Sequence, residues 1–108
     1  MAYYMLQGAY TSEAWAVQVQ NPQDRVELVR PTFERLGGTI ESAWFAFGEY
    51  DIVIIAQFPD NVSAAALAIA ISAGGAFKSA KTTPLMSIEE GVEAMRKAGG
   101  AGYKPPGS

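Results

Sequence analysis

Residues 47–60 of the chain read FGEYDIVIIAQFPD, and this stretch decides the fold. Within it, residues 51–58 hold a run of β-branched residues bounded by Gly48 and Pro59, which predicts a central strand buried on both faces. The preceding residues 39–47 are rich in aromatic side chains and predict another strand. Because only a short turn at Gly48 and Glu49 separates the two, we expect an antiparallel hairpin with a loop of about two residues.

A helix is expected on each side of this hairpin. Before it, Asn21 and Pro22 predict a helix start and Gly37 predicts the end, with a bend at Pro31 because proline lacks the amide that the helix needs. After it, Asp60 predicts the N-cap of a helix that runs to about residue 73. That helix is apolar on all sides, so we expect it to be buried on all sides.

Two further strands and a last helix complete the pattern. Residues 3–10 and 77–85 each read as a strand. Ser87 and Glu90 predict a capping box at the start of a helix that stops at residues 99–100. Residues 11–20 stay ambiguous, since Ser12 could cap one short turn that carries Trp15.

The order strand, helix, strand, strand, helix, strand predicts an α+β fold of the ferredoxin-like βαββαβ type. In this arrangement an antiparallel sheet carries two helices on one face, and this chain adds a C-terminal helix. The other face of the sheet must then bear apolar side chains. We expect a second copy of the chain to cover it, giving a homodimer or a higher homo-oligomer.

Three short motifs resemble a known family. They are GAYT at residues 8–11, LGGT at residues 36–39 and, above all, GEYD at residues 48–51. In this order and spacing they make residues 3–97 similar to the GYD domain family. The resemblance implies a ferredoxin-like subunit of the dimeric α/β-barrel kind, from a soluble, bacterial-type protein. The family is essentially uncharacterised, so the resemblance implies no activity.

The resemblance also sets the domain limits that we expect. Residues 1–98 form the GYD-type domain, and residues 99–108 form a flexible C-terminal tail. The chain departs from the family pattern at Trp15 and Pro31, which affects the local geometry of residues 12–31 and not the fold.

Composition excludes several classes of chemistry. The 108 residues include 8 basic and 11 acidic side chains, a net charge of −3 that argues against a nucleic-acid partner. The chain has no cysteine and no histidine, which excludes disulfides, thiolate nucleophiles, Ser-His-Asp triads, His-ligated haem and ordinary zinc sites. We therefore expect neither a metal nor a cofactor.

The sequence also predicts where the chain works. Its longest apolar stretch, residues 64–71, is much shorter than the ~20 residues that span a membrane. The first residues lack the pattern of a secretory signal peptide. We expect no membrane partner and a cytoplasmic location.

The candidate catalytic residues are Glu49, Tyr50 and Asp51, the most concentrated polar cluster in the chain. A carboxylate base, Asp51 or Glu49, would stand beside the phenol of Tyr50, and burial against apolar strands would raise the pKa of the carboxyl group. Alternatively, Gly48 and Glu49 form a solvated turn, and Asp51 accepts a hydrogen bond from a nearby backbone amide.

Four strand residues are candidates for ligand binding: Gln7, Trp44, Gln57 and Lys81. Trp44 belongs to a set of aromatic rings that could line a cavity for a flat apolar molecule, or that simply fill a core or an interface. The set consists of Tyr3, Tyr4, Tyr10, Trp15, Trp44 and Phe45. Gln7 and Gln57 could orient a ligand or pair with each other. Lys81 could anchor an anion or protect a sheet edge from aggregation.

These observations favour a non-catalytic small-molecule-binding or assembly module. The alternative is a cofactor-free enzyme, isomerase-like or monooxygenase-like, that uses Tyr50 and Asp51 on a small apolar substrate. A purely structural oligomer is a third hypothesis. Whether the protein is an enzyme is left open by the sequence.

Overall fold

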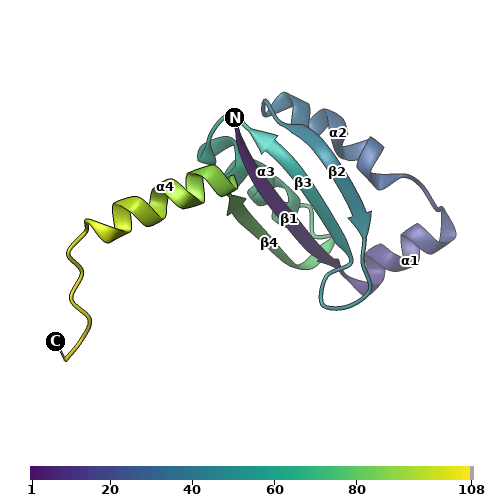
Figure 1. Ribbon diagram of the computed structural model, residues 1–108. Helices are drawn as coiled ribbons and strands as arrows, with labels where there is room; N and C mark the ends of the chain where they lie inside the picture. Colours follow the sequence, from purple (N-terminus) through teal and green to yellow (C-terminus); the bar gives the residue numbers. More distant parts are fainter. Residues whose placement is uncertain (108) are drawn as a thin grey trace.

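One antiparallel sheet with helices on one face forms the body of the protein. The structure is a computed structural model that describes residues 1–107 (Figure 1). Its elements in chain order are β1 (Ala2–Tyr10), α1 (Ser12–Gln20), α2 (Arg25–Arg35), β2 (Thr39–Phe45), β3 (Ile52–Phe58), α3 (Asn61–Ala73), β4 (Phe77–Leu85) and α4 (Ile88–Gly99). The sheet order is β2-β3-β1-β4, with every neighbouring pair antiparallel. The predicted α+β, ferredoxin-like arrangement is therefore confirmed.

The core lies between the sheet and the helices. Alternate residues of β3, from Ile52 to Phe58, are buried, while those between them are only half-buried. The Phe58 ring stacks on Phe33 of α2 with ring centres 5.7 Å apart, and Leu67 of α3 belongs to the same buried cluster. The expectation that β3 is buried on both faces is wrong for a single chain, because all of the packed helices cover the same face.

The segment between β1 and β2 contains two helices where the sequence indicated one and an ambiguous turn. α1 is a full helix capped by the Thr11 hydroxyl, which accepts a hydrogen bond from the Ala14 amide at 3.1 Å. Asn21 lies at the C-terminal end of α1, where its amide donates to the Val17 carbonyl at 3.0 Å. The expectation that Asn21 caps the next helix is therefore wrong.

Asp24 caps α2 in place of Asn21. Its carboxylate accepts a hydrogen bond from the Glu27 amide at 3.1 Å. The helix continues through Pro31, as expected. It ends at Arg35 with Leu36 as its C-cap, followed by Gly37 at a φ of +78°, a left-handed conformation that favours glycine.

The β2–β3 hairpin is longer than expected. Residues 46–51 connect the strands, and within this loop the Ala46 amide donates to the Asp51 carbonyl at 2.8 Å. β2 also shifts register between Ile40 and Ser42, which adds a bulge beside β3. The hairpin itself is antiparallel, as predicted.

The last two helices differ in how they pack. α3 begins at the predicted N-cap Asp60, but it buries only Ala64 and Leu67, and Ile69 remains 69% exposed. The expectation that α3 is buried on all sides is therefore wrong, because only its sheet-facing side has a neighbour.

α4 projects away from the sheet (Figure 1) and has no buried residue. Its N-terminus has the predicted capping box between Ser87 and Glu90. This projection makes the molecule 59 Å long, with a radius of gyration of 17.4 Å, against about 13 Å for a compact domain of this length. Residues 101–107 contain no helix or strand, and Ser108 of the predicted tail lies outside the described residues. Within residues 1–107, no helix is long and apolar enough to cross a membrane.

Candidate functional site

The register of the sheet brings the predicted ligand-binding residues onto one face. Trp44 lies opposite Val53, Val53 opposite Gln7, and Gln7 opposite Lys81, so they form one row across all four strands. Gln57 is on the same face of β3, four residues after Val53. This is the face that no helix covers, and we call it the open face.

The open face mixes apolar and polar side chains. Trp44 is 67% exposed, and Met5, Val53 and Ile55 are half-buried beside it. Gln57 donates a hydrogen bond to the Glu41 carboxylate of β2. The alternative that Gln7 and Gln57 pair with each other is therefore wrong.

The predicted catalytic cluster lies at the end of the sheet, in the loop before β3. Glu49 is exposed and Tyr50 is half-buried. One oxygen of the Asp51 carboxylate accepts hydrogen bonds from the Tyr10 backbone amide at 2.9 Å and from the Trp15 indole nitrogen at 3.3 Å. Asp51 thus joins the end of β1 and helix α1 to the start of β3.

A second region lies on the helix side of the sheet, and Tyr10 is the member of the predicted aromatic set that lines it. A cavity of about 590 Å³, open to solvent on one side, lies beside the core and is lined by the sheet and by α1, α2 and α3. Its apolar wall includes Phe33, Ile52, Ile54, Leu67, Ile71 and Phe77. We call this space the helix-side cavity. It has the size of a small-molecule site, for which roughly 300–1,000 Å³ is usual.

The wall of the helix-side cavity at β1 and β4 is aromatic. The Tyr10 ring stacks on Phe77 with centres 4.5 Å apart and meets Trp15 edge-on at 5.1 Å. Phe77 in turn lies over Gly8, where a Cβ atom would stand 2.5 Å from the ring. A glycine at position 8 is therefore required for the Phe77 ring to occupy this place.

Tyr10 and Arg25 are polar residues that line the helix-side cavity. Burial raises the pKa of Tyr10, the Arg25 guanidinium lowers it and the Asp51 carboxylate raises it, with burial the largest effect. The phenol is consequently protonated and able to donate a hydrogen bond at neutral pH. Sequence reasoning counted Tyr10 only among the aromatic rings and gave Arg25 no role, since no local pattern links residues on β1 and α2.

A protein-family model matches most of this chain. The GYD domain model matches residues 4–95 of the 108. The chain belongs to the GYD domain family. A comparison with curated proteins finds no match.

The motifs of this GYD domain lie at the two ends of the sheet. Asp51 of the GEYD motif fixes the sheet end to α1, and Gly8 of the GAYT motif accommodates Phe77. Within residues 1–107, no group of three acidic side chains gathers as a metal site would require. Gly8 and Asp51 lie together at the end of the sheet where β3 begins, whereas the LGGT motif lies at the opposite end, where Gly38 packs against Phe58.

Proposed function

We propose that this GYD domain is a non-catalytic binding module that takes a small, mostly apolar molecule in the helix-side cavity. The observation that carries the proposal is the size and lining of this space, about 590 Å³ with a largely apolar wall and a few polar groups. Small-molecule sites combine these two features, because the apolar wall supplies affinity and the polar groups set the orientation.

A pair of tryptophan variants on α3 tests the proposal. Ala70 lines the cavity and is exposed, so Ala70→Trp should fill the cavity without disturbing the core. Ala65 is exposed on the same helix and does not line the cavity, which makes Ala65→Trp the matched control.

The probes are naphthalene-ring compounds, naphthamide and naphthoate, titrated by calorimetry. We expect wild type and Ala65→Trp to bind at least one probe, and Ala70→Trp to bind neither. Failure of wild type to bind both probes, or undiminished binding by Ala70→Trp, would contradict the proposal.

We further propose that the domain self-associates through the open face. Trp44 at 67% exposure and Tyr3 at 46% lie on one face with Met5, Val53 and Ile55, and α4, which has no buried residue, does not cover them. Apolar patches of this kind favour an interface, and a second copy can place the same patch against it by two-fold symmetry. This supports the homodimer and the dimeric barrel that the family resemblance implies.

Light scattering tests the self-association. Wild type should give a mass near twice the 11.5 kDa of one chain, and Trp44→Glu should give a monomer. Phe47→Glu is the matched control, because Phe47 is fully exposed in the hairpin loop outside the strands. A wild-type monomer at micromolar concentration would contradict the assembly proposal and leave the binding proposal standing.

The enzyme alternative with Tyr50 and Asp51 has less support. One oxygen of the Asp51 carboxylate, the candidate base, accepts two hydrogen bonds already, from the Tyr10 amide and the Trp15 indole. We therefore place the alternative second. A cytoplasmic location is part of the proposal, supported by the absence of cysteine, which cytosolic domains do not need.

A further inference from the structure

We infer that the helix-side cavity selects small planar carboxylic acids, with the carboxylate held between the Tyr10 hydroxyl and the Arg25 guanidinium. This inference rests on the proposed function and adds the chemical class of the ligand. Three features of the cavity carry it: a phenol hydroxyl without a protein partner, an unpaired cation and a stacked aromatic pair.

The Tyr10 hydroxyl is the hydrogen-bond donor of the proposed site. The Tyr10 residue is only 6% exposed and lines the cavity. Its backbone amide binds Asp51, whereas its hydroxyl forms no hydrogen bond with any of residues 1–107. The hydroxyl oxygen itself is not fully buried, so at the surface of the cavity it is free to donate a hydrogen bond to a ligand oxygen.

Arg25 supplies the positive charge. It is half-buried at the first position of α2 and makes no ion pair with a carboxylate of residues 1–107. Its neighbour Asp24 is occupied as the N-cap, accepting from the Glu27 amide. The Arg25 charge is near enough to Tyr10 to lower the pKa of the phenol. Because Arg25 and Tyr10 line the same cavity, the inference places one anionic headgroup between them.

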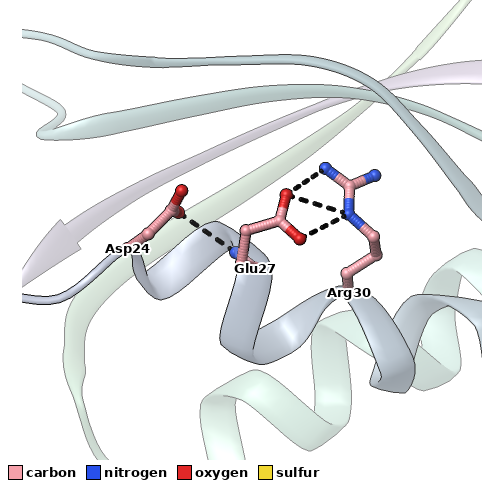
Figure 2. Close-up of polar contacts among 3 residues, drawn as sticks. All are labelled: Asp24, Glu27 and Arg30. Atoms are coloured by element: carbon pink, nitrogen blue, oxygen red, sulfur yellow. Dashed lines mark hydrogen bonds and ion pairs between the residues drawn. The ribbon is translucent and has the colours of Figure 1, made fainter.

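Arg30, in the middle of α2, differs from Arg25 because it is paired with a carboxylate of its own helix. Arg30 contacts both oxygens of the Glu27 carboxylate, with its Nη2 atom 2.9 Å from Oε1 (Figure 2). Arg30 is absent from the lining of the cavity. Two arginines on one helix thus differ in charge environment, since Arg30 is neutralised within the helix and Arg25 is not.

The aromatic wall sets the shape of the ligand. Tyr10 and Phe77 stack with an angle of 23° between their ring planes, so an outer face of the stack is a flat surface to which a further ring can add. A planar ring can pack against such a surface while its carboxylate reaches the phenol. Glu13 also lines the cavity, but it is exposed on α1, so its charge is screened by solvent.

Paired probes and paired variants test the inference. Naphthoate and its neutral analogue naphthamide share ring and size and differ in charge. Wild type should bind naphthoate about tenfold or more tightly than naphthamide, because a charged acceptor strengthens both hydrogen bonds. Arg25→Gln and Tyr10→Phe should each reduce this preference, while Arg30→Gln on the same helix should retain it.

Each outcome bears on the inference. Equal affinity for the two probes, or a preference unchanged in Arg25→Gln and Tyr10→Phe, would overturn it, and loss of both probes in Ala70→Trp would then leave the proposed cavity function intact. Circular dichroism melts check that each variant folds. Arg25→Lys keeps the charge and should keep part of the preference, which a merely structural arginine would not explain.

Discussion

The helix side and the open face of the sheet are made from the same strands, yet they are covered differently. On β3, Ile54 is buried under the helices, and the next residue, Ile55, is half-buried on the open face. Both are β-branched, so the chemistry of the strand does not distinguish its two sides. The positions of α2 and α3 do, because both pack on one face and α4 projects away from the other.

The contrast indicates how stability and function are divided in this domain. The helix side holds the packed core and, beside it, the helix-side cavity. The open face contributes little to the fold of one chain but offers an apolar surface for a second copy. Variants on the two faces should therefore affect different measurements.

The largest effect is expected from Phe58→Ala on the helix side. The Phe58 ring is fully buried, stacks on Phe33 and meets Tyr4 edge-on at 5.8 Å. Truncating such a ring leaves a cavity, so the free energy of unfolding should fall by about 3–5 kcal/mol. Urea denaturation measures it, and a loss below about 1 kcal/mol would contradict the core assignment.

The next effect, smaller than that of Phe58→Ala, is expected from Ile54→Ala. Ile55→Ala, on the opposite face of the same strand, is the variant to compare with it. Ile54→Ala should lower the free energy of unfolding by about 2–5 kcal/mol at every protein concentration. Ile55→Ala should have its effect mainly at high concentration, because it weakens a contact between copies. Equal, concentration-independent losses would show that the two faces are equivalent within one chain.

Asp51→Asn should give an intermediate loss. It removes the charged acceptor of the Tyr10 amide and the Trp15 indole, so we expect a loss of about 1–2 kcal/mol and a changed emission of Trp15. The emission is measured in a Trp44→Phe background, with Glu49→Gln as the control on the same hairpin. An unchanged stability together with a lost catalytic activity would instead favour the enzyme alternative.

The smallest expected effect is the pH dependence of the capping hydrogen bonds at the starts of α3 and α4, which should differ between the two helices. Hydrogen bonds from Ser63, its backbone amide first, lower the pKa of the Asp60 carboxyl, and bonds from Ser87 do the same for Glu90. A lowered pKa in the folded state means that each contribution is present above the ordinary carboxyl pKa and is lost as the pH falls through the lowered pKa.

The two helices should respond differently to this acidification. Asp60→Ala should remove part of the acid sensitivity of global unfolding, because α3 packs on the sheet. Ser87→Ala should reduce helicity in α4 alone, measured by nuclear magnetic resonance shifts, because α4 has no buried residue. A matching shift in global unfolding for Ser87→Ala would show that α4 packs on the body in solution.

Much of the fold could be predicted because its signals are local. The alternation of β3, the N-cap Asp60 and the capping box of Ser87 and Glu90 each depend on residues within a few positions. The start of α2 was missed for a tertiary reason. Asn21 is a good cap by type, but α1 extends to Gln20 and takes Asn21 as its own end.

The candidate sites divide in the same way. Gln7, Trp44 and Lys81 could be selected as candidates from their residue types, but their single row across the sheet follows from strand register. Asp51 could be expected to bind a backbone amide, but the amide belongs to Tyr10, forty-one positions away. The residues next to Asp51 in the sequence do not indicate so distant a partner.

By itself, the sequence determined the strands, most of the helix ends, the βαββαβ order and the exclusion of thiol and histidine chemistry. These features depend on backbone periodicity, on hydrogen bonds between near neighbours and on which side chains are present at all. Only the tertiary structure decided that α4 leaves one sheet face open, and that Tyr10 and Arg25 line one cavity. Those features depend on how far apart whole elements pack, which no short stretch of the chain specifies.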